Sequence, residues 1–305
     1  MSRFLLSRFG QALVVLWGVC TIVFFLLHLS GDPAQLMLPP NASQEDVENL
    51  RHMLELDRPL QEQYVSYLVR LAHGDFGTSF RHRQPALQLI AERVPATVQL
   101  TLAALLVTIL IALPLGTISA LKRDTAVDGL SAFVALLGQC VPTFWLGLVL
   151  IMLFAVQWRI FPALGAGTPA HLVLPAITLG AYSAALTTRM LRSSLLDVLN
   201  QEFVRTAHAK GLTERLVLWR HVAPHAAIPV ITVIALQVGQ LLSGAIVTET
   251  VFNYPGMGLL VIQAISGRDF TVVQAFVILL AVVIVVLNLL VDIVYSVVDP
   301  RVRLG

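Results

Sequence analysis

The sequence predicts an all-α integral membrane protein with six transmembrane helices, and three observations carry this prediction. Of the 305 residues, 57% are hydrophobic and only 12% are charged, which is about half the charged share of a soluble domain. Six apolar runs are long enough to cross a hydrocarbon core about 30 Å thick, which takes roughly 20 helical residues. The basic residues between these runs fall mainly on one side of the predicted membrane.

The first apolar run follows a basic flank, Arg3 and Arg8, that resembles the start of a signal peptide. The run is too long for a signal-peptide core and no small-x-small cleavage site follows it, so we expect a retained helix. The fourth run has the weakest pattern because Pro175 and Gly180 lie inside it, although neighbouring helices can cover the backbone groups that such residues free. The predicted spans are 9–29, 97–121, 130–158, 171–190, 226–248 and 272–298.

The distribution of charge predicts that both termini face the cytoplasm. With the N-terminus inside, the inner segments hold 12 of the 20 basic residues but only 6 of the 18 acidic residues. Lysine and arginine are enriched in the cytoplasmic loops of membrane proteins. The net charge of +2 is too small to indicate nucleic acid binding.

Residues 31–93 are predicted to form an external segment with two amphipathic helices. Asn41 and Ser43 are candidate N-caps, and Asp46 follows Ser43 at the spacing of a capping box. Pro59 suits a first helical position, and apolar residues then recur at helical spacing. These helices either lie on the membrane or support a partner, and we expect them to pack on the outer face of the protein. The glycines at 74 and 77 predict a turn.

The long inner segment, 189–225, predicts a helix–glycine–helix elbow. One helix is expected through 197–210, Gly211 ends it, and Thr213 caps a second short helix. Leu212, Leu216 and Trp219 are predicted to share one face of that helix. An elbow of this shape suits docking into a groove on a soluble partner. An amphipathic linker lying on lipid head groups would show the same pattern.

The sequence lacks the patterns of several other functional classes. It has no G-x-x-x-x-G-K-[ST] loop for nucleotide and no H-E-x-x-H. Cys20 and Cys140 form no Cys/His cluster, so neither a metal site nor a disulfide is expected. Asp292 is the one clear carboxylate within a span, which is little for a self-sufficient ion-coupled transporter. We therefore expect no catalytic residue and no bound cofactor in this chain, and an energy source outside it.

Eight short segments along the chain are similar, in the same order, to segments of one known family. With them, nearly all of the chain resembles the inner-membrane permeases of the dipeptide, oligopeptide and nickel ABC importers, on the side of the first of their two permease subunits. Seven of the segments are HLSGDP at 28–33, GDFGTS at 74–79, RVPAT at 93–97, PTFWLG at 142–147, LPA at 174–176, FNYPGMG at 252–258 and DPR at 299–301.

The eighth and most specific segment is EFVRTAHAKGL at 202–212. It resembles the peptide-importer form of the EAA loop, E-A-A-x3-G-x9-I-x-L-P, the permease element that docks into the ATPase. Arg205 and Thr206 stand where the general motif has glutamate and alanine, as is common in peptide-type permeases. His221 and Ala223 replace its isoleucine and leucine, and these departures leave the choice of ATPase open. The resemblance assigns coupling to Glu202, Arg205, Thr206, Ala207, Lys210, Gly211, Leu212 and Pro224.

The resemblance implies a type I ABC importer permease fold, with an N-terminal helix over 1–30 and a transmembrane domain over 94–300 that carries the coupling loop at about 200–225. It also implies a second permease, two ATPase subunits that hydrolyse ATP with Mg²⁺, and an external solute-binding protein at a bacterial cytoplasmic membrane. Candidate residues for the solute path, with helix packing and turn formation as the alternative, are Pro142, Phe144, Trp145, Asn253 and Tyr254.

The expected solutes are dipeptides and oligopeptides. Nickel or other metal chelates, glutathione and opines use permeases of the same pattern and remain alternatives. A secondary transporter that works alone is the alternative from another class.

Overall fold

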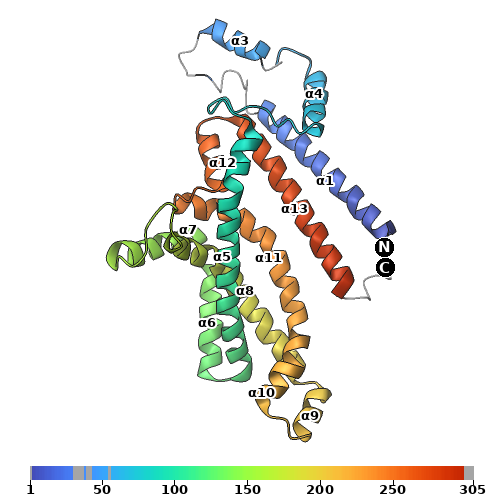
Figure 1. Cartoon of the computed structure of the whole chain (residues 1–305), viewed down its shortest axis with the longest axis vertical. Helices are drawn as coiled ribbons and strands as arrows, with labels where there is room; N and C mark the ends of the chain where they lie inside the picture. Colours follow the sequence, from blue (N-terminus) through green and yellow to red (C-terminus); the bar gives the residue numbers. More distant parts are fainter. Residues whose placement is uncertain (1, 30–37, 39–42, 54–55, 299–305) are drawn as a thin grey trace. The chain divides into compact units, whose positions relative to one another are not determined.

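The computed structural model describes residues 2–29, 38, 43–53 and 56–298, and for 2–7, 50, 53 and 290–298 it describes the backbone alone. The side chain of Asp292 and the cap candidate Asn41 therefore lie outside the described part. Two compact units are present (Figure 1). The first unit comprises Met1–Pro95 and Leu259–Gly305, and the second comprises Ala96–Gly258.

The first unit is built on two long helices that pack together, α1 (Ser2–Leu29) and α13 (Phe270–Val298). It also holds α3 (Gln44–Met53), α4 (Leu60–Ala72), nearly all of α12 (Met257–Ser266) and the start of α5 (Ala86–Leu121). The Tyr64 hydroxyl lies 2.7 Å from Thr21 Oγ1, and the Tyr64 ring packs edge-on against Phe24. The α4 helix thus packs on the protein, as expected.

A capping box begins α3, as its sequence predicts. The amide of Asp46 donates to Ser43 Oγ at 3.1 Å, and the Asp46 carboxylate accepts from the Ser43 amide at 3.2 Å. Hydrogen bonds from Ser43 hold the pKa of the Asp46 carboxyl below its ordinary value. Pro59 is the N-cap residue of α4, one position before its predicted place. The turn at Gly74 and Gly77 is present, with positive φ at both glycines.

The second unit is organised around α8 (Ala170–Leu199), which packs against both α6 (Ala126–Cys140) and α11 (Ala223–Val251). The remaining helices of this unit are α7 (Thr143–Leu150), a π-helix η1 (Ile151–Gln157), α9 (Glu202–Ala209), α10 (Glu214–Val217) and a π-helix η2 (Leu218–Val222). Within the described chain, five helices are long and apolar enough to span a membrane, or six if the bent pair of α6 with α7 and η1 counts as one span.

The third predicted span, 130–158, is bent into two helical segments. The α6 segment and the segment of α7 with η1 meet at 106°. Pro142 disfavours helical backbone at the residue before it, and Val141 is extended, with φ −76° and ψ 124°. Proline also lacks the amide hydrogen that would continue the helix.

Two helix boundaries also differ from prediction. The α5 helix begins at Ala86, well before residue 97, because Leu89 and Ile90 are buried and belong to it. The continuous helix expected over 197–210 is wrong. The α8 helix ends at Leu199, where Asn200 Nδ2 donates to the Leu196 carbonyl at 2.9 Å, and α9 starts after an extended Gln201.

Gly180 is predicted to be essential for the packing of α8 on α5. A Cβ atom at this position would lie 2.7 Å from the carbonyl oxygen of Ala104. We expect Gly180→Ala to destabilise the protein by about 1–3 kcal/mol, because a backbone atom cannot give way as a side chain can. The thermal midpoint of the purified protein measures the effect. Gly129→Ala in α6, which meets no atom within 4 Å, is the control and should keep or raise the midpoint.

Candidate functional site: a coupling loop and its supports

The predicted coupling loop forms two short helices joined by a tight turn (Figure 1). The amide of Gly211 donates to the His208 carbonyl at 2.9 Å, and Gly211 has φ +78°, which glycine adopts without strain. Thr213 is the N-cap residue of α10, as predicted, but its hydroxyl makes no capping hydrogen bond. The glycine therefore allows the sharp change of direction between α9 and α10.

The inner face of the loop is anchored in an apolar cluster. Val204 and Ala207 of α9 and Val217 of α10 are buried, and Leu212 packs against the same cluster. The α8 and α11 helices supply five further buried side chains of this cluster, from Leu191, Leu195, Val198, Ala226 and Val230. A displacement of the loop would therefore act directly on two long helices.

The predicted face of Leu212, Leu216 and Trp219 is not the buried face of this segment. Leu216 and Trp219 are 41% and 65% exposed, whereas Val217 and Val222 are buried. The α10 helix changes to π spacing at Leu218, which shifts the register that regular helical spacing assumes. The exposed indole of Trp219 was not among the predicted coupling residues.

The outer face of the loop is polar and exposed. The Arg205 guanidinium donates to Glu202 Oε1 at 2.9 Å, and both side chains are well exposed, so this pair contributes little to stability. Of the eight residues predicted for coupling, Ala207 is buried and Leu212 is half-buried. The other six are exposed: Glu202, Arg205, Thr206, Lys210, Gly211 and Pro224.

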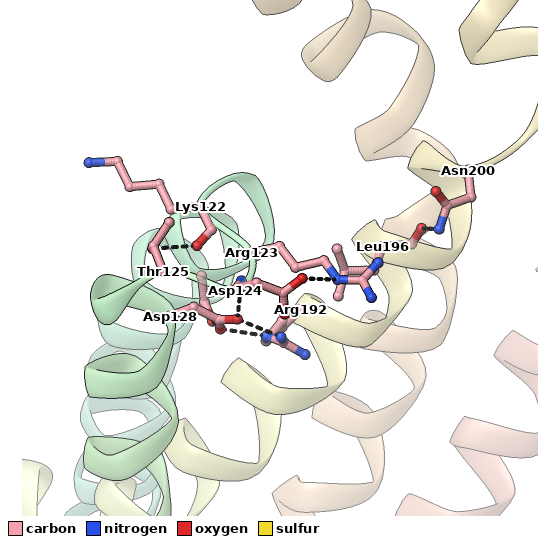
Figure 2. Close-up of polar contacts among 9 residues, drawn as sticks. Lys122, Arg123, Asp124, Thr125, Asp128, Arg192, Leu196 and Asn200 are labelled. Atoms are coloured by element: carbon pink, nitrogen blue, oxygen red, sulfur yellow. Dashed lines mark hydrogen bonds and ion pairs between the residues drawn. The ribbon is translucent and has the colours of Figure 1, made fainter.

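A partly buried ion pair supports the same part of α8 (Figure 2). The Asp128 carboxylate accepts from Nε and Nη2 of Arg192, both at 2.7 Å. It also accepts from Ser119 Oγ at 2.5 Å and from the amide of Asp124 at 3.2 Å. Asp124 has φ +60°, so the carboxylate stabilises an unusual turn. Arg192 follows Leu191 of the apolar cluster, which places this pair beside the anchor of the loop.

The two segments proposed for the solute path lie close together in the second unit. A Cβ at Gly147 would come 3.1 Å from the Phe252 ring. Pro142, Phe144, Trp145 and Asn253 are exposed. Tyr254, in contrast, is buried, and its hydroxyl donates to Gln99 Oε1 at 3.1 Å. Its side chain therefore packs in the interior of this unit.

Glu249, which the sequence placed only near the end of a span, holds the turn at 252–258. Its buried carboxylate accepts from Thr97 Oγ1 at 2.6 Å and from the amide of Gly258 at 2.7 Å. The amide of Met257 in turn donates to Thr97 Oγ1 at 2.8 Å. A single carboxylate therefore links α5, α11 and the start of α12.

Long apolar helices, together with a loop that has one anchored face and one exposed face, are expected of the membrane component of a transport complex. Residues 112–304 match the family described as "Binding-protein-dependent transport system inner membrane component", and residues 1–101 match the N-terminal family of the same system. The chain belongs to this family of inner-membrane transport components.

Relatives match along the whole chain. It is 37% identical over 340 residues to the dipeptide transport system permease protein DppB of Escherichia coli K12, with 99% of each chain covered. It is 38% identical over 304 residues to the glutathione transport system permease protein GsiC of the same strain, again with 99% of each covered. The predicted resemblance to this permease family is confirmed.

Solved structures confirm the fold. A chain of the MetNI methionine ABC transporter has a TM-score of 0.59 at 18% identity, covering 70% of this chain and 97% of its own. A chain of an amino acid ABC transporter has a TM-score of 0.53 at 16% identity, covering 70% and 94%. The chain has the type I ABC importer permease fold. It is the permease subunit of an ABC importer, is not itself catalytic, and works with ATPase and binding-protein partners.

Proposed function

We propose that this chain translocates short peptides across the cytoplasmic membrane as one of two homologous permeases. Two ATPase subunits hydrolyse ATP with Mg²⁺, an external protein delivers the solute, and the assembly is a transport ATPase. The relatives named for dipeptide and for glutathione transport are nearly equally similar to this chain, and glutathione is itself a small peptide. Nickel or other metal chelates and opines are the alternative solutes of the same importer class.

The observation that carries the proposal is the two-faced coupling loop. Its outer face is exposed and polar, whereas Val204, Ala207 and Val217 anchor its inner face to α8 and α11. Closure of the two ATPases would draw this loop and its counterpart on the second permease together. The anchored cluster would pass that movement to α8 and α11, and the helices would rock between inward-open and outward-open states.

The loop also supports an orientation with both termini in the cytoplasm. ATP is hydrolysed in the cytoplasm, so the exposed face of α9 must lie there. The charge distribution of the sequence favours the same orientation. A cysteine placed at Lys210 should react with a membrane-impermeant maleimide in inside-out vesicles and be protected in intact cells.

The direct test is ATP-dependent uptake of a labelled dipeptide by proteoliposomes that hold the complete complex. Uptake that vanishes when this chain is omitted would support the proposal. If the loaded binding protein still stimulates ATP hydrolysis but no dipeptide enters, peptide transport is refuted for that dipeptide. Labelled glutathione and a nickel chelate then test the alternative solutes in the same vesicles.

Gly211→Asp is expected to reduce uptake about tenfold, within the usual range of coupling energies, while the protein remains in the membrane. A Cβ at Gly211 meets no atom within 4 Å, so the folding cost is limited to about 1 kcal/mol for the positive φ. The added carboxylate, however, lies at the apex of the docking surface. Uptake and membrane content are both measured, and unchanged uptake would contradict the coupling role.

Gly74→Asp is a matched control for this variant. Gly74 has φ +79° and also meets no atom within 4 Å, so the backbone cost of the substitution is the same. It lies in the predicted external turn, away from the loop in the sequence. Uptake by this variant should remain close to that of the unaltered protein.

A further inference from the structure

A cavity of about 710 Å³ lies inside the first unit, and no residue of the coupling loop or of the candidate solute path lines it. The α1 and α4 helices, the loop at 75–83 and the first turns of α13 enclose it. Its volume falls within the usual range of small-molecule sites. Its walls differ in chemistry from one part to another.

The apolar part of the wall comes from the two membrane-spanning helices. Phe24 and Leu27 of α1 line it together with Ala275 and Ile278 of α13. These residues belong to apolar spans, so this part of the cavity lies at membrane depth. Tyr67 of α4 also lines it, and its buried hydroxyl has no hydrogen-bond partner among the described residues. A buried hydroxyl normally has a partner, which a ligand would supply.

The polar part of the wall is cationic. Arg70, Arg81 and Arg83 line it, and within the described chain none of their guanidinium groups makes a hydrogen bond or ion pair. Asp75 is the acidic residue among the lining side chains, and its carboxylate already accepts from the amide of Gly77 at 2.9 Å. Three arginines against one carboxylate favour an anion. Guanidinium groups match the geometry of phosphate oxygens especially well.

The loop that presents two of these arginines is held firmly. The buried Ser79 hydroxyl donates to the buried Asp269 carboxylate and accepts from the amide of His82 at 2.9 Å. Thr78 forms an isolated antiparallel bridge with Pro85. A Cβ at Gly267 would lie 2.5 Å from Arg81 Nη1, so that guanidinium packs closely over Gly267. The cationic end of the cavity is therefore preorganised, because these contacts fix the loop that carries Arg81 and Arg83.

We propose that this cavity binds one anionic phospholipid. The phosphodiester lies against Arg70, Arg81 and Arg83, and an acyl chain follows the wall formed by α1 and α13. The Tyr67 hydroxyl donates a hydrogen bond to an ester oxygen between them. A free phosphate ion or an acidic peptide would satisfy only the cationic end and would leave the apolar wall uncovered.

Native mass spectrometry of the purified complex, titrated with phosphatidylglycerol, tests this site. Phosphatidylcholine with the same acyl chains should be retained more weakly, and glycerol phosphate should not displace the bound lipid. Equal retention of both lipids would overturn the charge selection. Displacement by glycerol phosphate would show a simple phosphate site and overturn the lipid proposal. Displacement by a soluble acidic peptide alone would assign the surface to a protein partner instead.

Matched variants separate this site from general attraction of anionic lipid. Arg81→Gln should weaken retention of phosphatidylglycerol about fivefold, the loss expected for one arginine near an anionic lipid surface. Tyr67→Phe should weaken it about threefold, as loss of one hydrogen bond does. Arg159→Gln removes the same charge from an exposed residue outside the cavity and should change nothing. Equal losses in the two arginine variants would overturn the proposal.

Discussion

Asp128→Asn is expected to lower the thermal midpoint of the permease by roughly 5–10 °C. The substitution keeps the shape of the side chain but leaves the Arg192 guanidinium without its anion, and Arg192 is only one-third exposed. Removing one partner of a buried pair costs about 3–5 kcal/mol, and the partial exposure of Arg192 reduces this to about 2–3 kcal/mol. A loss of that size corresponds to the stated shift for a chain of this length.

The neighbouring exposed pair is the control for this prediction. Arg123 Nε lies 3.2 Å from Asp124 Oδ2, and both side chains are mainly exposed (Figure 2). Arg123→Gln should therefore change the free energy of unfolding by no more than about 1 kcal/mol. Its thermal midpoint should shift correspondingly little. Equal shifts for the two variants would mean that the pair of Asp128 and Arg192 contributes no more to stability than an exposed ion pair does.

Asp128→Asn should also affect the coupling of ATP hydrolysis to transport. Asp128 lies in the first turn of α6, and Arg192 lies between two residues of α8 that anchor the loop, Leu191 and Leu195. The pair therefore ties the turn between α5 and α6 to the part of α8 that packs against the loop. In proteoliposomes, fewer solutes should be imported per ATP hydrolysed. An unchanged ratio at a lowered midpoint would limit the pair to stability.

Local patterns in the sequence predicted the local parts of this structure. Ser43 and Asp46 are three residues apart, and their capping box depends on nothing outside that turn. Glycine often ends a helix because it adopts a positive φ without strain, and Gly211 does so here. The elbow could therefore be predicted from this glycine. The apolar residues at helical spacing in α4 also predicted a packed face, because an apolar face is stable only when another surface buries it.

Features that depend on distant residues could not be predicted in this way. Arg192 pairs with Asp128, which is 64 residues away in the sequence. The sequence alone indicated only an arginine near the end of a span. Glu249 meets Thr97 across 152 positions. The exposed position of Trp219 depends on the π spacing of η2, which no regular helical period describes. Tertiary pairing and irregular helices therefore account for the site residues that were missed.

The bend within the third span lies between these two cases. Pro142 lies inside the predicted span, but an apolar run of this length also suits a continuous helix. What decides is the extended backbone of Val141, together with the packing of Gly147 close to Phe252. The bend brings both path segments into one region, which neither segment indicates alone.

Gly258→Ala is expected to destabilise the permease by about 3 kcal/mol or more, the upper end of the range for overpacking. A Cβ at this position would lie 2.4 Å from the Cα of Ile246 and 2.9 Å from Glu249 Oε2. The Ile246 contact is to backbone, so a rotamer change cannot relieve it. The turn that Glu249 holds must then open, and the amide of Gly258 loses its bond to the carboxylate.

Helix propensity alone predicts the opposite result, which makes this test decisive. Gly258 lies in the first turn of α12, and alanine is favoured over glycine by about 1 kcal/mol inside a helix. Gly239→Ala in α11 is the matched control, because its Cβ meets no atom within 4 Å. That variant should keep or raise the thermal midpoint of the purified protein. A midpoint for Gly258→Ala at or above that of the control would refute the close packing of Gly258 against Ile246 and the role of Glu249 in holding the turn.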